Sequence, residues 1–93
     1  MLLAIDCGNT NTVFAVFDGT SQLGAWRTST NAGRTADEYA VWLTGLMALN
    51  ELDRSSIDAV ILATVVPATW YNLKSLCNKY FDIDPMVVGD PAL

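Results

Sequence analysis

The sequence predicts one α/β domain in which a mixed sheet with flanking helices follows the order β-β-β-α-β-α-β. Three observations predict this fold. The chain begins with short runs of β-branched, aliphatic and aromatic residues separated by turn residues. Two later segments carry apolar residues at helical spacing. Between them lies a nearly continuous apolar run, which is typical of a central parallel strand buried on both faces.

The first third of the chain predicts an antiparallel meander of three strands. The first two strands are expected at about residues 2–6 and 12–17. The pair Asp18-Gly19 favours a hairpin turn after them. A third strand is expected at about residues 23–28, although Gly24 interrupts it.

The first helix is expected from about residue 36 to residue 50. Thr35 and Glu38 have the spacing of a capping box, in which each side chain satisfies a backbone donor of the first turn. The buried face of this helix is predicted to carry Tyr39, Leu43, Leu46 and Met47, widened by Trp42 and Leu49.

The rest of the chain predicts a β-α-β unit. The apolar strand at about residues 57–63 is followed by Thr64-Val65-Val66-Pro67, and Pro67 suits a turn or a helix start. A second helix is expected at about residues 68–81, and a short fifth strand at residues 85–88 ends at Gly89-Asp90-Pro91. The second helix is predicted to bury Trp70, Leu73, Leu76, Cys77 and Tyr80.

A meander followed by right-handed β-α-β crossovers has the element order of the ribonuclease H-like fold. Each lobe of the actin-like ATPases and sugar kinases has this fold, and the hairpin between its first two strands holds nucleotide phosphates. We therefore expect residues 1–93 to form a single nucleotide-phosphate-binding lobe. Such a lobe normally adds another helix after its fifth strand.

The connection between the first two strands has unusual turn residues, Asp6-Cys7-Gly8-Asn9-Thr10-Asn11-Thr12. Glycine allows a tight turn and close approach of a ligand, and hydroxyl, amide and successive N–H groups can cradle an anion. Asp6 would repel a bare phosphate, so we expect Mg²⁺ or an ordered water between them. The hypothesis is a hairpin that binds the phosphates of Mg·ATP, and the alternative is a plain turn without a ligand.

The composition excludes several function classes. The net charge is −5 and only 5 scattered Lys and Arg residues are present, so nucleic-acid binding is not expected. The chain has no histidine, so a metal would need oxygen ligands, which favours Mg²⁺ over zinc. No apolar run is long enough to span a bilayer and no signal peptide is recognisable, which predicts a cytoplasmic protein with free thiols at Cys7 and Cys77.

The hydrophobic fraction of 52% is high for so short a chain. Either several strands are buried on both faces, or the chain is part of a larger protein that covers the excess apolar surface.

Other polar residues have competing interpretations. Thr64 ends a strand at the sheet edge where ligands of α/β proteins bind, but it could equally be a plain strand end. Arg27 and Arg34 flank a polar loop that could face a cleft, although surface charge is the favoured interpretation. Asp37 and Glu38 are explained by their place at a helix start.

Several blocks, in order, resemble the type III pantothenate kinases, a family of the actin-like kinase superfamily. The stretch from Asp6 to Val13 resembles the family's Asp-x-Gly-Asn-Thr phosphate motif. The later blocks are Trp26-Arg27-Thr28-Ser29-Thr30, Arg34-Thr35-Ala36-Asp37-Glu38-Tyr39, Thr64-Val65-Val66-Pro67 and Val87-Val88-Gly89. Thr64 stands where the family has serine, which keeps the hydroxyl.

The resemblance implies an ATP-dependent enzyme that phosphorylates pantothenate to 4′-phosphopantothenate, the first step of coenzyme A biosynthesis. It implies that ATP phosphates contact Asp6, Cys7, Gly8, Asn9, Thr10, Asn11, Thr12 and Val13, with Asp6 holding Mg²⁺ through water. Family members are two-lobed homodimers and carry a Gly-x-Asp-Arg motif with the presumed catalytic base. That motif, the pantothenate pocket and a site for K⁺ or NH₄⁺ are absent from these 93 residues, so we expect the chain alone to be inactive and to contain no catalytic residue.

Three alternatives remain open at this point. The chain could be a lobe of a sugar or acetate kinase. It could belong to a regulatory protein of the same fold that binds nucleotide without turnover. It could also be an interaction domain whose hairpin binds nothing.

Overall fold

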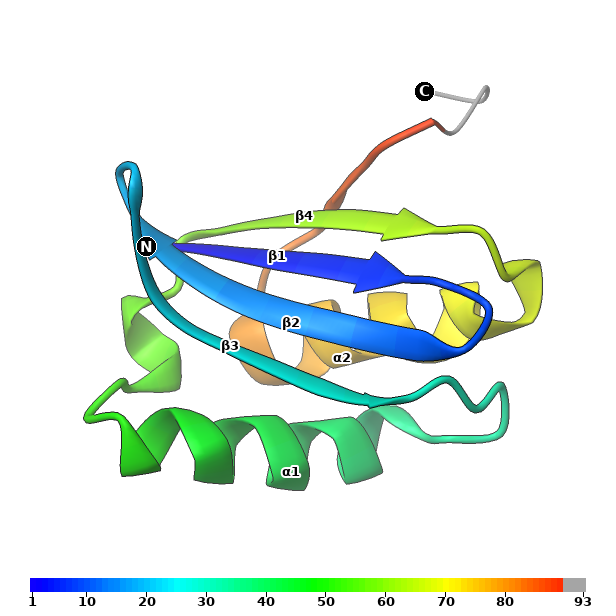
Figure 1. Ribbon diagram of the computed structural model, residues 1–93, viewed down its shortest axis with the longest axis horizontal. Coiled ribbons are helices and arrows are strands. Elements are labelled where there is room, and N and C mark those ends of the chain that lie inside the picture. The colour runs from blue at the N-terminus through cyan, green and yellow to red at the C-terminus, as the bar shows by residue number, and fades with distance from the viewer. Residues whose placement is uncertain (90–93) are drawn as a thin grey trace.

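The computed structural model describes residues 1–89, which form a five-stranded mixed sheet with two α-helices packed against one face (Figure 1). The elements are β1 (Leu2–Cys7), β2 (Asn11–Asp18), β3 (Ser21–Ser29), α1 (Ala36–Leu49), β4 (Ala59–Thr64), α2 (Trp70–Phe81) and β5 (Met86–Val87). Two short 3₁₀ helices, η1 (Arg54–Ser56) and η2 (Pro67–Thr69), precede β4 and α2.

The strands lie in the order β3-β2-β1-β4-β5, so the first strand is at the centre of the sheet. The pairs β1–β2 and β2–β3 are antiparallel, whereas β1–β4 and β4–β5 are parallel. The predicted order of elements is confirmed. The predicted end of the fifth strand at Asp90-Pro91 lies outside the described residues.

The helix starts follow their local sequence. Thr35 and Glu38 form the expected capping box, with the Glu38 N–H donating to Thr35 Oγ1 at 3.2 Å. Before β4, Asp53 Oδ1 accepts from the Ser55 N–H at 2.9 Å and starts η1, so the strand begins at Ala59, two residues later than expected. Pro67 starts η2, which delays α2 until Trp70.

The sheet has one covered face within residues 1–89. In β4, Val60 and Leu62 are buried, Ile61 is half-buried and Ala59 is exposed. The prediction that this strand is buried on both faces is therefore wrong for the described residues, because both helices pack on the same side. The opposite face, here called the outer face, carries the surplus of apolar side chains, among them Leu2, Ala4, Val13, Phe17, Ile61 and Met86.

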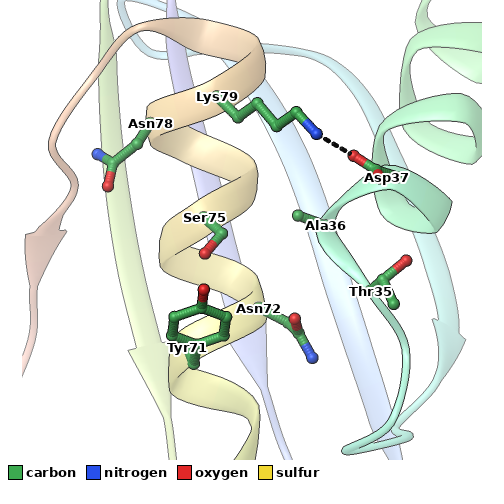
Figure 2. A pocket seen from close by; sticks show the side chains of 8 residues that line it. All are labelled: Thr35, Ala36, Asp37, Tyr71, Asn72, Ser75, Asn78 and Lys79. Carbon is green, nitrogen blue, oxygen red and sulfur yellow. Dashed lines mark hydrogen bonds and ion pairs between the residues drawn. The ribbon is translucent and has the colours of Figure 1, made fainter.

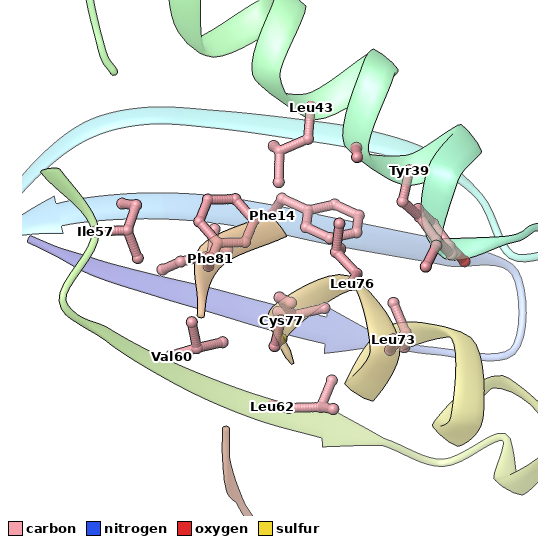
Figure 3. Packing of buried hydrophobic residues seen from close by; sticks show 14 of the residues in the cluster. Phe14, Tyr39, Leu43, Ile57, Val60, Leu62, Leu73, Leu76, Cys77 and Phe81 are labelled. Carbon is pink, nitrogen blue, oxygen red and sulfur yellow. The ribbon is translucent and has the colours of Figure 1, made fainter. Parts of the chain in front are cut away.

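The core fills the space between the sheet and the two helices (Figure 3). Phe14 lies at its centre, with its ring centroid 5.6 Å from that of Tyr39 and 5.4 Å from that of Trp42. Leu43 of α1 and Leu76 of α2 are fully buried beside it. These contacts join both helices to the central strands through one continuous cluster.

The predicted helix faces are largely confirmed. Trp42, Trp70 and Tyr80 are partly buried and pack against the core. Leu49 is the clear error, since it is 80% exposed instead of buried. It is the last residue of α1, where helix ends commonly lie at the rim of the core.

Gly24 does not interrupt β3, which runs from Ser21 to Ser29. A glycine stands at this position because the indole of Trp26 occupies the space where a side chain would lie. A Cβ atom added to Gly24 would be 2.6 Å from Trp26 Cη2, which is closer than such atoms approach. Gly24 pairs with Val16 and Trp26 pairs with Phe14, so both lie on the helix-covered face. The glycine therefore leaves room for the Trp26 indole, which packs against the core.

We predict that Leu43→Ala lowers the free energy of unfolding of the chain by about 2–5 kcal/mol, because it leaves a cavity at a fully buried position. The matched control Leu49→Ala, on the same helix but exposed, should change it by less than about 0.5 kcal/mol. Urea denaturation followed by circular dichroism measures both. Equal effects of the two substitutions would contradict the packing of α1 described above.

Candidate phosphate-binding hairpin

The turn between β1 and β2 presents a row of free polar groups. The Gly8 N–H donates to the Asn11 carbonyl at 2.9 Å and closes the turn. Asn9, Thr10 and Asn11 are exposed, and within residues 1–89 their side chains make no hydrogen bond. The amide and hydroxyl groups of three successive residues are thus available to an anion at the end of the sheet.

The backbone of Gly8 does not have a positive φ angle, so its conformation does not require a glycine. The positive φ angles among glycines of the described residues belong to Gly19 and Gly89. A Cβ atom added at Gly8 would lie 3.4 Å from the Asn11 carbonyl oxygen, a contact that the turn tolerates. What the glycine provides here is access for a ligand to the main chain.

Asp6 is exposed at the carboxyl end of β1, one residue before the strand ends. It pairs with Val13, which in turn pairs with Arg27, so these three residues form a row on the outer face. Nowhere in residues 1–89 do three acidic or cysteine side chains gather in a way that could hold a metal by themselves. A single exposed carboxylate does suit Mg²⁺, which proteins commonly bind with one or two carboxylates plus waters and substrate phosphates.

Cys7 and Thr12 have the opposite orientation and lie beneath the hairpin. Their exposed fractions are 1% and 0%, so their side chains face the core and not the solvent. Thr12 Oγ1 lies 3.3 Å from Cys7 Sγ and 2.9 Å from Thr30 Oγ1, and Thr30 Oγ1 donates to the Gly8 carbonyl at 2.7 Å. Burial raises the pKa of the Cys7 thiol, but the surrounding threonine hydroxyls outweigh it and hold that pKa below its usual value.

Thr64 lies at the same edge of the sheet, since it pairs with Cys7 across β1 and β4. Its hydroxyl accepts from the Val66 N–H at 3.1 Å and lies 2.9 Å from Thr69 Oγ1. These bonds shape the turn into η2. A direct contact of Thr64 with a ligand stays a prediction, as does one of Val13, which is half-buried on the outer face.

The two arginines near the polar loop differ. Arg34 Nη1 donates to Thr28 Oγ1 at 2.9 Å and to the Ser29 carbonyl at 2.6 Å, and its guanidinium lies 5.7 Å from the centre of the Tyr39 ring. Arg34 therefore stabilises the loop between β3 and α1 through these hydrogen bonds. Arg27 is exposed on the outer face.

The acidic pair at the start of α1 has structural roles. Glu38 belongs to the capping box. Asp37 accepts from Lys79 Nζ at 2.8 Å and also from the Tyr80 hydroxyl, which ties α1 to α2. The hydrogen bond from Lys79 and then that from Tyr80 hold the pKa of the Asp37 carboxyl below its usual value.

An open groove of about 480 Å³ lies between the start of α1 and the length of α2 (Figure 2). The ion pair between Asp37 and Lys79 closes one end, and Tyr71 and Asn72 line the other part. The groove includes no residue of the hairpin, and its lining offers no charged group beyond that ion pair. It is a shallow polar seam between two helices.

Two residues of this region had no signal in the local sequence pattern. Thr30 follows β3 within a polar loop, and Thr69 ends η2, yet both reach the buried side of the hairpin. Their role depends on the pairing of β1 with β2 and β4, which lie far apart in the sequence. Thr30 does occur in one of the blocks that carry the family resemblance.

Comparisons with known proteins agree over nearly the whole chain. The type III pantothenate kinase family matches residues 2–93. Curated relatives described as type III pantothenate kinase include one from Rhodospirillum rubrum, 63% identical over 91 residues, and one from Paramagnetospirillum magneticum, 58% identical over 93 residues. These alignments cover 98% and 100% of this chain but 35% and 36% of the relatives, so the chain spans about a third of their length.

A solved structure supports the fold. The putative N-acetylglucosamine kinase of Porphyromonas gingivalis superposes with a TM-score of 0.62 and 22% identity, covering 94% of this chain and 33% of that one. This likeness confirms the predicted mixed α/β fold of the chain. None of the helices in the described part of the chain is long and apolar enough to cross a membrane.

We predict that neither cysteine reacts with iodoacetamide in the native chain during the time in which a urea-denatured sample reacts fully. Both thiols are at most 1% exposed, and burial raises the pKa of Cys77 to about 12. Mass spectrometry of tryptic peptides reports each site separately. Rapid labelling of Cys7 alone, with Cys77 as the internal control, would contradict the closed packing beneath the hairpin.

Proposed function

The chain belongs to the type III pantothenate kinase family, and from this premise we propose that it is the triphosphate-binding lobe of an ATP-dependent pantothenate kinase. The proposed reaction transfers the γ-phosphoryl group of ATP to the primary hydroxyl of pantothenate and yields 4′-phosphopantothenate. One observation carries the proposal. The family match extends over a lobe whose central hairpin presents three successive exposed polar residues at the end of the sheet.

In this proposal the hairpin residues bind and orient the phosphates. The main-chain N–H groups of the turn and the side chains of Asn9, Thr10 and Asn11 donate hydrogen bonds to phosphate oxygens. The Asp6 carboxylate accepts from water around the Mg²⁺ that accompanies the nucleotide. When bound, the Mg²⁺ would supply neutralisation of phosphate charge, which is the main requirement of phosphoryl transfer besides positioning.

The remaining parts of the proposed enzyme lie outside these 93 residues. Pantothenate binding, the catalytic base and a site for K⁺ or NH₄⁺ are assigned to the further two thirds of the relatives' length. The homodimer and the cytoplasmic location expected from the sequence stay predictions.

We predict that Asp6→Asn in the full-length protein lowers kcat/KM for Mg·ATP by at least about tenfold, as for other residues that orient a metal through water. The matched control Asp18→Asn removes an exposed carboxylate at the far end of the same hairpin and should have no effect. A coupled assay of ADP release with pantothenate measures both. An unchanged dependence on Mg²⁺ in Asp6→Asn would refute the assigned role.

The substrate is tested with the full-length protein and the same assay. ADP release is expected with pantothenate, and not with N-acetylglucosamine or acetate. ADP release with a sugar or with acetate, but not with pantothenate, would support the alternative of a sugar or acetate kinase. Nucleotide binding with no ADP release in the presence of any of these acceptors would support a regulatory protein. The isolated chain should produce no phosphorylated pantothenate above a blank without protein.

A further inference from the structure

We propose that Thr30, supported by Thr12 and Cys7, is a positioning residue that turns main-chain N–H groups of the hairpin toward the bound phosphates. This inference rests on the proposed function and adds residues that do not themselves touch the ligand. Its basis is a row of hydrogen bonds beneath the hairpin, between the turn at Gly8 and the start of α2.

Thr30 holds two carbonyl groups of the turn at the same time. Its N–H donates to the Thr10 carbonyl at 2.8 Å, and its hydroxyl donates to the Gly8 carbonyl at 2.7 Å. One residue of the loop after β3 therefore fixes two of the peptide groups that form the turn.

The orientation of those carbonyls decides where the neighbouring N–H groups point. A trans peptide is planar, so its C=O and its N–H point in opposite directions. Because the Gly8 carbonyl points toward Thr30, the N–H of Asn9 points away from Thr30. The same holds for the Thr10 carbonyl and the N–H of Asn11. Within residues 1–89 the Asn9 N–H donates to no acceptor, so it is available to a phosphate oxygen.

Thr12 and Cys7 keep the Thr30 hydroxyl in place from below. A threonine hydroxyl carries one hydrogen, and that of Thr30 is used by the Gly8 carbonyl. Thr12 is therefore the donor in its 2.9 Å contact with Thr30, and it shares this hydrogen with Cys7 Sγ at 3.3 Å. Thr12 is completely buried, so water cannot replace a lost partner.

The row continues to the turn after β4. Cys7 Sγ lies 3.4 Å from Thr69 Oγ1, which donates to the Val66 carbonyl at 2.7 Å. Thr64 Oγ1 lies 2.9 Å from Thr69 Oγ1. Hydrogen-bond contacts thus link the hairpin both to the loop after β3 and to the start of α2.

The test uses the full-length protein and the variants Thr30→Val and Thr30→Ser. Valine keeps the shape but leaves the Gly8 carbonyl without its donor and the Thr12 hydroxyl with Cys7 Sγ as its one remaining side-chain partner. The unpaired carbonyl is relieved when it turns outward, which turns the Asn9 N–H inward. Thr30→Val should weaken binding of a non-hydrolysable Mg·ATP analogue at least tenfold in calorimetry. Thr30→Ser, which keeps the hydroxyl, should stay within about threefold of the unsubstituted protein.

A matched control and a kinetic pattern separate positioning from general destabilisation. Thr44→Val removes a hydroxyl that donates within α1 to the Ala40 carbonyl at 2.6 Å, and it should leave nucleotide binding unchanged. Thr30→Val should raise KM for ATP while KM for pantothenate stays the same. If Thr30→Val does not fold, Thr12→Val tests the same row from its buried end and should show the same pattern.

Amide chemical shifts measured by NMR without nucleotide test the turn independently of the proposed function. The Asn9 and Asn11 amide signals should move in Thr30→Val and not in Thr44→Val. Failure of the unsubstituted protein to bind Mg·ATP would refute the proposed function, while these shifts would still decide whether Thr30 sets the turn. Unchanged shifts, or unchanged affinity in Thr30→Val when the unsubstituted protein binds, would overturn the positioning role.

Discussion

The pairing of β1 with a neighbour on each side is the constraint on which the rest of the structure depends. Antiparallel pairing sets Cys7 opposite Thr12, and parallel pairing sets it opposite Thr64. Because all three side chains then face the helices, a polar row forms at one edge of a core that is otherwise apolar. The next row along the strands, Leu62, Ile5, Phe14 and Trp26, contains no polar side chain apart from the indole N–H.

Much of the fold could be predicted because its signals are local. Turn residues mark the hairpin, Thr35 and Glu38 mark the helix start, and the apolar run marks β4. The one-sided burial of β4 could not be predicted, because a continuous apolar run looks the same whether its second face meets a helix of its own lobe or another part of the protein. Gly24 looked like an interruption for a similar reason, since the Trp26 indole that covers it leaves no trace in strand propensity.

The candidate site likewise has a part that the sequence predicted and a part that only the structure shows. Sequence alone identified the exposed polar residues of the turn, because their spacing after a short strand is unusual for a plain connection. It also assigned Cys7 and Thr12 to the ligand, although the structure buries both side chains. Thr30 escaped notice because it meets Gly8 only after 22 residues of chain have folded back. The support beneath the turn is a tertiary property, whereas the turn itself is a local one.

The one-sided sheet has a consequence for synthesis of the protein on the ribosome. The core between sheet and helices is closed once α2 has emerged, and its buried residues extend from Leu3 to Phe81. These elements can therefore begin to pack together as soon as α2 has left the ribosome. At that stage the outer face, with its apolar side chains, is covered by no element of residues 1–89. The covering of the inner face is thus built into the order of the elements along the chain.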